Sequence, residues 1–158
     1  MRGRYNPGVR TIIVIPVFLI ASLLYGCGSS ATSDNLRIRD ITLPDGQVIH
    51  AEVSVTQQDL TRGLMYRDSL PGDRGMLYVY PQPGLFPRFL YHYEIPVDMV
   101  WLDAARKVVE IEPDAPPCKT SASACPHYGG TILSQYVLEM GAGMAARHRV
   151  EKGSQLSF

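Results

Sequence analysis

The sequence lacks a surplus of charge of either sign. Its 158 residues carry 15 Lys and Arg side chains against 15 Asp and Glu side chains, so the formal net charge is zero. Binding to nucleic acid depends largely on cationic contacts to phosphates. This balance therefore gives no reason to expect nucleic acid as a partner.

Several familiar catalytic and cofactor motifs are also missing. The chain has no Gly-rich phosphate loop, no nucleophile elbow built around Ser or Cys, and no zinc-binding helix motif. We therefore expect neither a cofactor nor a bound metal. The sequence also shows no internal repeat and no sign of a second folded domain.

Long hydrophobic runs are scarce, and the longest lies near the N-terminus. Residues 11–26 read TIIVIPVFLIASLLYG, and Arg2, Arg4 and Arg10 precede them. A positively charged start followed by an apolar stretch and small residues is typical of a secretory signal peptide. A membrane-spanning helix would need roughly 20 apolar residues, whereas this run is shorter and contains Pro16.

The end of this run predicts a lipid anchor. The sequence LYGC at positions 24–27 resembles a bacterial lipobox, in which the cysteine is acylated and becomes the new N-terminus. We predict a signal peptide over residues 1–26, an acylated Cys27 and a flexible tether over residues 27–35. Because Gly28 is not the Asp that marks inner-membrane retention, we favour a periplasm-facing lipoprotein of the outer membrane. An ordinary signal peptide or a short uncleaved anchor is the alternative.

Residues 36–158 are long enough for one domain, and two cysteines lie in one of its loops. Cys118 and Cys125 belong to the segment PPCKTSASACPHYGG. In an oxidising compartment two thiols this close should form a disulfide. A metal site that adds His127 is an alternative, although its spacing matches no usual zinc pattern. Free thiols are the third possibility.

Most of the regular pattern in this domain has the period of strands. Asp45-Gly46 separates two alternating runs, which is a strong hairpin signal, and Thr56 begins a capping-box-like pattern. The predicted strands cover residues 36–43, 47–56, 75–80, 86–93, 97–102, 107–112, 135–140 and 155–158, and the predicted helices cover residues 56–65 and 142–148. Many short strands with little helix predict a mainly β fold, a compact β-sandwich or open barrel with one or two short helices.

Several spaced motifs together resemble one known family. The motifs are TRGLMYR at 61–67, GMLYVY at 75–80, IPVDM at 95–99, CPHY at 125–128 and YVLE at 136–139. In this order they are similar to the bacterial and archaeal family called domain of unknown function 192. The resemblance covers roughly residues 48–158. It implies a compact, mostly β domain that is often exported and has no established activity.

One segment departs from that family's pattern. After Phe89 the family usually carries Trp-Met-Lys-Asn-Thr, whereas this chain has LYHYE at positions 90–94. The usual lysine and asparagine are replaced by His92 and Tyr93. A family site that depends on those two side chains would be altered here.

Asp98 lies in an apolar run that should be buried. A buried carboxylate is costly unless it meets a cation or hydrogen-bond donors, and Arg62 and Arg67 are the candidates. One interpretation is a structural ion pair between helix and sheet. The other is a ligand-binding pocket walled partly by Tyr78, with convergent polar groups in an apolar surround. The candidate pocket residues are Arg62, Met65, Arg67, Met76, His92, Asp98 and Glu139.

These features support three hypotheses about function. The first is an envelope lipoprotein whose β domain binds a small ligand, a glycan or a protein partner. The second is a hydrolytic enzyme that acts on an envelope polymer through Asp98, Glu139 or His92. The third is a purely structural or assembly role. We favour the first because the sequence shows a candidate charged pocket and no recognisable catalytic constellation.

Overall fold

The computed structural model describes residues 38–158, together with Gly3 and Gly8. The predicted signal peptide, the acylated Cys27 and the tether over residues 27–35 therefore lie outside the described residues. Within the described part of the chain, no helix is long and apolar enough to cross a membrane.

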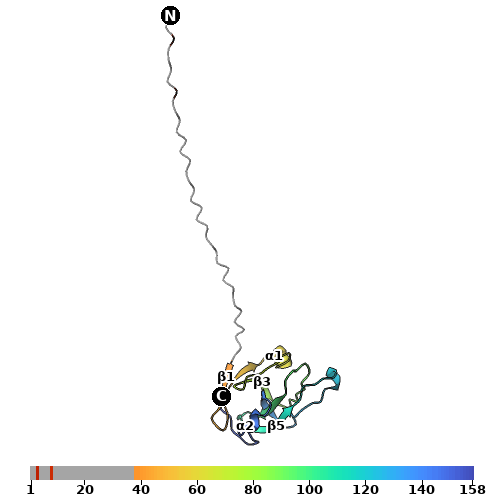
Figure 1. Ribbon diagram of the computed structural model, residues 1–158. Helices are drawn as coiled ribbons and strands as arrows, with labels where there is room; N and C mark the ends of the chain where they lie inside the picture. Colours follow the sequence, from red (N-terminus) through yellow and green to blue (C-terminus); the bar gives the residue numbers. More distant parts are fainter. Residues whose placement is uncertain (1–2, 4–7, 9–37) are drawn as a thin grey trace. The chain divides into compact units, whose positions relative to one another are not determined.

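Six strands form one mixed sheet in the order β1-β2-β3-β6-β4-β5. Strands β1, β3 and β5 of this sheet are labelled in Figure 1. Neighbouring strands are antiparallel except β2 and β3, which are parallel and are connected through α1. The elements are β1 (Ile38–Thr42), β2 (Val48–Ser54), α1 (Gln57–Arg62), β3 (Arg74–Gly84), β4 (Val97–Leu102), β5 (Val108–Ala115), η1 (Ala122–Ala124), β6 (Ser134–Gly141) and α2 (Met144–Arg147). The prediction of a mainly β domain with short helices is confirmed, and the sheet does not close into a barrel.

Two local signals in the sequence form the structures that they predict. The turn at Asp45 and Gly46 joins β1 to β2, and Gly46 has φ +89°, which glycine adopts without a steric penalty. Thr56 is the N-cap of α1, and its hydroxyl accepts a hydrogen bond from the Asp59 N–H at 3.2 Å. Both structures depend on residues that lie within a few positions of each other in the sequence.

Two segments predicted as strands do not join the sheet as strands. Residues 86–93 form only isolated bridges, from Arg88 to Tyr128 and from Tyr91 to Cys118. Residues 155–158 likewise form only single bridges, to Thr42 in β1 and to Lys107 just before β5. Both segments pair with loops or strand ends, so their alternating pattern does not continue a ladder.

Strand β3, by contrast, is longer than the predicted run of residues 75–80. It extends to Gly84 through Pro81 and Pro83, and its pairing with β6 is irregular between Val79 and Gly84. Proline has no N–H to donate to a ladder. The irregular pairing explains how two prolines fit into this strand.

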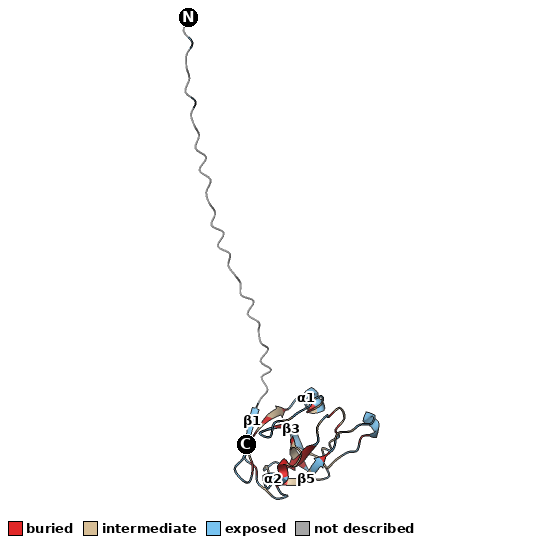
Figure 2. Cartoon of the chain, viewed as in Figure 1, coloured by how far each residue is buried: buried red, intermediate tan, exposed pale blue. Residues whose placement is uncertain are grey.

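The sheet buries an apolar cluster on each face. Strand β4 is buried along its whole length, as the apolar run predicts. Figure 2 shows buried residues in red within the sheet and exposed residues in blue at α1. We call the first cluster the α2 face: Ile41, Leu43, Ile49, Ala51, Leu77, Val100, Leu102, Val108, Leu138, Met140, Met144, Ala145, Val150 and Leu156. We call the second the α1 face: Leu64, Met76, Tyr78, Leu90, Tyr93, Val97, Met99, Trp101, Ala115 and Val137. The α2 face is aliphatic, whereas the α1 face contains the large aromatic side chains.

Candidate ligand-binding site

Asp98 is fully buried but does not meet an arginine. Its carboxylate accepts hydrogen bonds from the backbone N–H groups of Asp114 at 2.9 Å, Gly143 at 3.0 Å and Ala145 at 2.7 Å. Two of these donors belong to the start of α2, where a negative charge is favourable. Asp98 therefore caps α2, and the prediction that Arg62 or Arg67 neutralises it is wrong.

The register of the sheet explains this error. Asp98 lies opposite Met140, whose side chain belongs to the α2 face. Arg67 pairs instead with Glu52, with its Nη1 at 2.6 Å from one carboxylate oxygen. Arg62 is exposed at the end of α1. The alternation of a β-strand thus directs the carboxylate away from both arginines.

Glu139 lies on the opposite face of the sheet from Asp98. Glu139 is paired across β4 and β6 with Met99, a member of the α1 face, and its side chain is fully buried. Its carboxylate accepts hydrogen bonds from the hydroxyls of Tyr78 and Tyr93, each at 2.8 Å, and from Arg88 Nε at 3.1 Å. Because the sheet separates Asp98 from Glu139, these two carboxylates do not form a hydrolytic pair.

Arg88 is the important residue that sequence reasoning missed. Its side chain is only 12% exposed, and its guanidinium lies over the Tyr78 ring at 3.8 Å from the ring centroid. Such a contact between a cation and an aromatic face is attractive. A signal was present in the sequence, because Arg88 is the one charged residue within the segment LFPRFLY. The same reasoning had drawn attention to Asp98.

The electrostatics of this cluster keep Arg88, Tyr78 and Tyr93 protonated. Burial alone would lower the pKa of Arg88, but the neighbouring Tyr78, Glu139, Tyr93 and Tyr80 outweigh burial and raise it well above its usual value. Burial is the largest cause that raises the pKa of both Tyr78 and Tyr93. For Tyr93, the negative charge of Glu139 is the next largest cause that raises the pKa. Both phenols therefore remain hydrogen-bond donors to Glu139.

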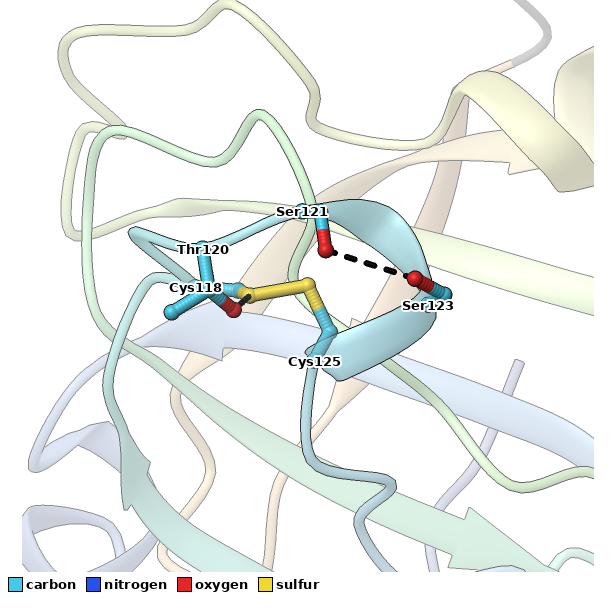
Figure 3. Close-up of a disulfide and its surroundings, with 5 residues drawn as sticks. All are labelled: Cys118, Thr120, Ser121, Ser123 and Cys125. Carbon is cyan, nitrogen blue, oxygen red and sulfur yellow. Dashed lines mark hydrogen bonds between the residues drawn. A yellow bond between two sulfur atoms is a disulfide. The ribbon is translucent and has the colours of Figure 1, made fainter.

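The disulfide loop holds Arg88 in place. Arg88 and Tyr128 exchange backbone hydrogen bonds at 2.9 and 2.7 Å, and the Cys118 N–H donates to the Leu90 carbonyl at 3.0 Å. Cys118 and Cys125 form a disulfide that closes this loop (Figure 3), which confirms the predicted pairing. Their sulfurs are bonded to each other and so do not ligate a metal. Among the residues that the structure describes, no cluster of three metal-ligating side chains occurs.

Gly63 lets the end of α1 approach the two tyrosines. It has φ +48°, and a Cβ at this position would overlap the Tyr78 hydroxyl and lie 2.7 Å from the Tyr93 hydroxyl. The next residue, Leu64, donates its backbone N–H to the Tyr93 hydroxyl at 3.3 Å. Glycine is thus required here both for its conformation and for its lack of a side chain.

A pocket of about 360 Å³ lies next to this cluster. Its lining residues come from α1, from β3 and from the segment that carries Arg88: Gln57, Leu60, Thr61, Met65, Tyr80, Pro81, Phe86, Arg88, Phe89 and Tyr93. Phe86 stacks on Tyr80 with ring centroids 3.4 Å apart. Most of the wall is therefore apolar or aromatic, with Arg88, Gln57 and Thr61 as its polar groups.

The structure brings few of the predicted pocket residues together. Met65 lines the pocket, and Glu139 lies behind it as the partner of Arg88. Met76 is buried in the core of the α1 face, and His92 stacks on Tyr66 outside the lining. Arg62, Arg67 and Asp98 do not line it.

Arg88 can offer hydrogen bonds to a molecule in the pocket. A guanidinium carries five N–H donors, and only Nε makes a short contact, to Glu139 at 3.1 Å. Its Nη1 and Nη2 have long contacts of 3.4 Å to the Leu60 carbonyl and 3.5 Å to the Tyr93 hydroxyl. An apolar pocket with a few placed polar groups is the usual form of a small-ligand site.

The fold and this site define a small, mainly β domain with one open mixed sheet and a largely buried arginine at an aromatic pocket. The chain belongs to the DUF192 family, described as an uncharacterized ACR, whose model matches residues 41–158. This membership confirms the resemblance found in the sequence motifs. No curated protein matches the chain.

Two solved structures share the fold. A protein of unknown function from Novosphingobium aromaticivorans is 24% identical with a TM-score of 0.67, and the match covers 77% of this chain and 85% of that one. A candidate transcription regulator from Sinorhizobium meliloti is also 24% identical with a TM-score of 0.64, and the match covers 75% of this chain and 89% of that one. At this identity the likeness concerns the fold alone.

Proposed function

We propose that this protein is a cell-envelope lipoprotein whose β domain binds a small, uncharged ligand in the Arg88 pocket. The observation that carries the proposal is the largely buried guanidinium that lines an aromatic pocket and makes only long hydrogen bonds through Nη1 and Nη2. The pocket volume of about 360 Å³ suits a ligand of one or two rings.

The charge of the site favours an uncharged ligand. Arg88 is the one charged side chain that lines the pocket, and Glu139 directly behind it supplies the opposite charge. An anionic ligand would compete with Glu139 for the Arg88 guanidinium. A cationic ligand would be repelled by the positive charge of Arg88. A neutral molecule that accepts hydrogen bonds uses the remaining N–H groups without breaking the buried pair.

The ligand proposal is tested by thermal unfolding of the full chain in the presence of uncharged envelope metabolites. Binding to the folded state raises the midpoint of unfolding. We expect Arg88→Lys to lose most of this shift, because lysine has no planar fork of donors. Arg62→Lys is the matched control, since Arg62 lies on α1 outside the lining and should keep the shift. No response from any uncharged compound would refute the proposal.

The anchor proposal rests on the sequence before the domain and has its own test. Mass spectrometry of the mature protein should find acyl chains on Cys27, and Cys27→Ser should release the protein from the membrane fraction. An unmodified Cys27 with an intact N-terminal segment would contradict this part of the proposal. It would leave the ligand-binding part untouched.

A further inference from the structure

Three aromatic side chains cluster at the surface of the domain: Tyr66 stacks on His92, and Tyr91 lies tilted against His92. The rings of Tyr66 and His92 lie 4.8 Å apart between centroids, and those of Tyr91 and His92 lie 3.8 Å apart. Tyr66 is 66% exposed, so one side of this stack faces solvent. We call Tyr66, Tyr91 and His92 the aromatic platform. Exposed aromatic clusters on soluble domains commonly mark binding surfaces.

The backbone of the platform is strained. Tyr66 has φ +64° and His92 has φ +58°, a region that bulky L residues rarely adopt. The Tyr66 N–H donates a hydrogen bond to the His92 carbonyl at 2.8 Å, which couples the two strained residues. Such strain persists only where the surrounding structure enforces it, and it clusters at ligand-binding positions.

The platform adjoins the Arg88 pocket along both of its segments. Tyr66 directly follows Met65, and His92 directly precedes Tyr93, and both of these neighbours line the pocket. Phe89, a further lining residue, is 36% exposed and lies two positions before Tyr91. The two loops that form the platform are therefore the loops that form part of the pocket wall.

Two charged residues beside the platform are paired in salt bridges. Arg67, next to Tyr66, pairs with Glu52, and Glu94, close to His92, pairs with Lys119 at 3.5 Å. The platform thus combines aromatic side chains with a largely balanced local charge. As in the pocket, this combination suits a neutral ligand rather than an ionic one.

We propose that the pocket and the aromatic platform together bind a neutral oligosaccharide. This inference rests on the proposed function, because it names the ligand class of the same pocket and adds a second subsite. A sugar ring has C–H groups on its faces, which suit the negative face of an aromatic ring. Its hydroxyls at the edges can accept from Arg88 and can bond with Gln57 and Thr61. One sugar unit occupies the pocket, and a neighbouring unit stacks on the platform.

Titration calorimetry with the full chain, in a detergent without sugar head groups, tests this inference. The probes are two neutral series of one to four linked sugars, one of glucose and one of N-acetylglucosamine. In at least one series we expect affinity to rise on going from one unit to two or three. Tyr66→Ala should weaken binding of the longer sugars about three- to tenfold, the loss expected for one aromatic contact. It should leave binding of the single sugar unchanged.

Three further variants separate the platform from the pocket and from the fold. Tyr66→Gly removes the ring while relieving the left-handed backbone, so it should behave like Tyr66→Ala with unfolding as in the wild type. Tyr66→Phe keeps the ring and should bind nearly as the wild type does. Ile38→Ala, which removes an exposed apolar side chain from β1, should have no effect.

The possible outcomes distinguish this inference from the proposed function. If Tyr66→Ala leaves the dependence on sugar length unchanged, the platform is not a subsite. If no sugar binds but another uncharged compound binds in an Arg88-dependent manner, the ligand class is wrong and the pocket stands. If nothing uncharged binds, the proposed function fails as well.

Discussion

Asp98 on the α2 face and Glu139 on the α1 face are both fully buried carboxylates from neighbouring strands. Asp98 is satisfied by three backbone N–H groups. Glu139 is satisfied by side chains, two phenols and a guanidinium. Backbone donors are fixed by the fold, whereas a long side chain such as arginine has donors left over for another molecule.

This difference separates a structural carboxylate from one that supports a site. On the α2 face, Met144 and Ala145 of the helix pack in the apolar cluster, and the buried charge of Asp98 stabilises the start of that helix. The α1 face leaves a pocket beside Arg88, and its buried charge holds the arginine in position. Burial of a carboxylate alone therefore does not identify a functional site. The groups that donate hydrogen bonds to the carboxylate, backbone or side chain, are more informative.

The largest expected effect is the loss of the Asp98 carboxylate. Asp98→Ala leaves three buried N–H groups without an acceptor, so we expect a loss of about 3 kcal/mol or more in the free energy of unfolding. Asp98→Asn keeps one acceptor oxygen and should lose less. Urea unfolding measures both. A loss of ligand binding without a loss of stability would break the distinction between the two faces.

Gly63→Ala should have the next largest effect, and on the α1 face. The added Cβ overlaps the Tyr78 hydroxyl and lies close to that of Tyr93, so we expect a loss of about 2 to 3 kcal/mol. Gly143→Ala is the matched control on the α2 face, because it also has positive φ but meets no atom within 4 Å. It should cost only about 1 kcal/mol by chemical denaturation. Equal losses would show that the tyrosine pair does not constrain α1.

Removal of the disulfide should cost about as much stability as Gly63→Ala, with an effect confined to one face. Replacing Cys118 and Cys125 by serine should cost about 2.5 kcal/mol in the chain-entropy model. The Arg88 amide, which bonds to Tyr128, should then exchange its hydrogen faster. At a temperature where the variant stays folded, the exchange rate of the Ala145 amide, which donates to Asp98, should change much less. Uniform acceleration at both amides would contradict a local role for the loop.

The smallest effect concerns an exposed charge beside α2. The hydrogen bond from His148 is the largest cause that lowers the pKa of Asp45 below its ordinary value of 3.8. A lowered folded pKa stabilises the protein above this value, and the contribution is lost as the pH falls through the folded pKa. As the pH falls from about 5 to about 3, the free energy of unfolding of Asp45→Asn should therefore decrease less than that of the wild type. Urea unfolding at each pH measures this difference. An unchanged acid dependence would contradict the pairing.

Local signals in the sequence were reliable because their partners lie close along the chain. The Asp45-Gly46 hairpin, the Thr56 cap and the Cys118–Cys125 disulfide each form as predicted. The apolar run of β4 also correctly predicts that Asp98 is buried. The predicted partner of Asp98 was wrong. Arg88 was overlooked because it lies in a segment that was interpreted as a strand. Both errors concern contacts between residues far apart in sequence.

The sequence by itself determined the mainly β class, the family, the hairpin, the disulfide and the burial of the strand that carries Asp98. These depend on periodicity, spacing and local hydrogen bonds. Only the tertiary structure decided which face each carboxylate occupies. A one-residue offset in a strand reverses the direction of a side chain, and Asp98 and Glu139 are opposite Met140 and Met99, not each other. The sheet register, which no local pattern encodes, therefore separates the helix cap from the pocket.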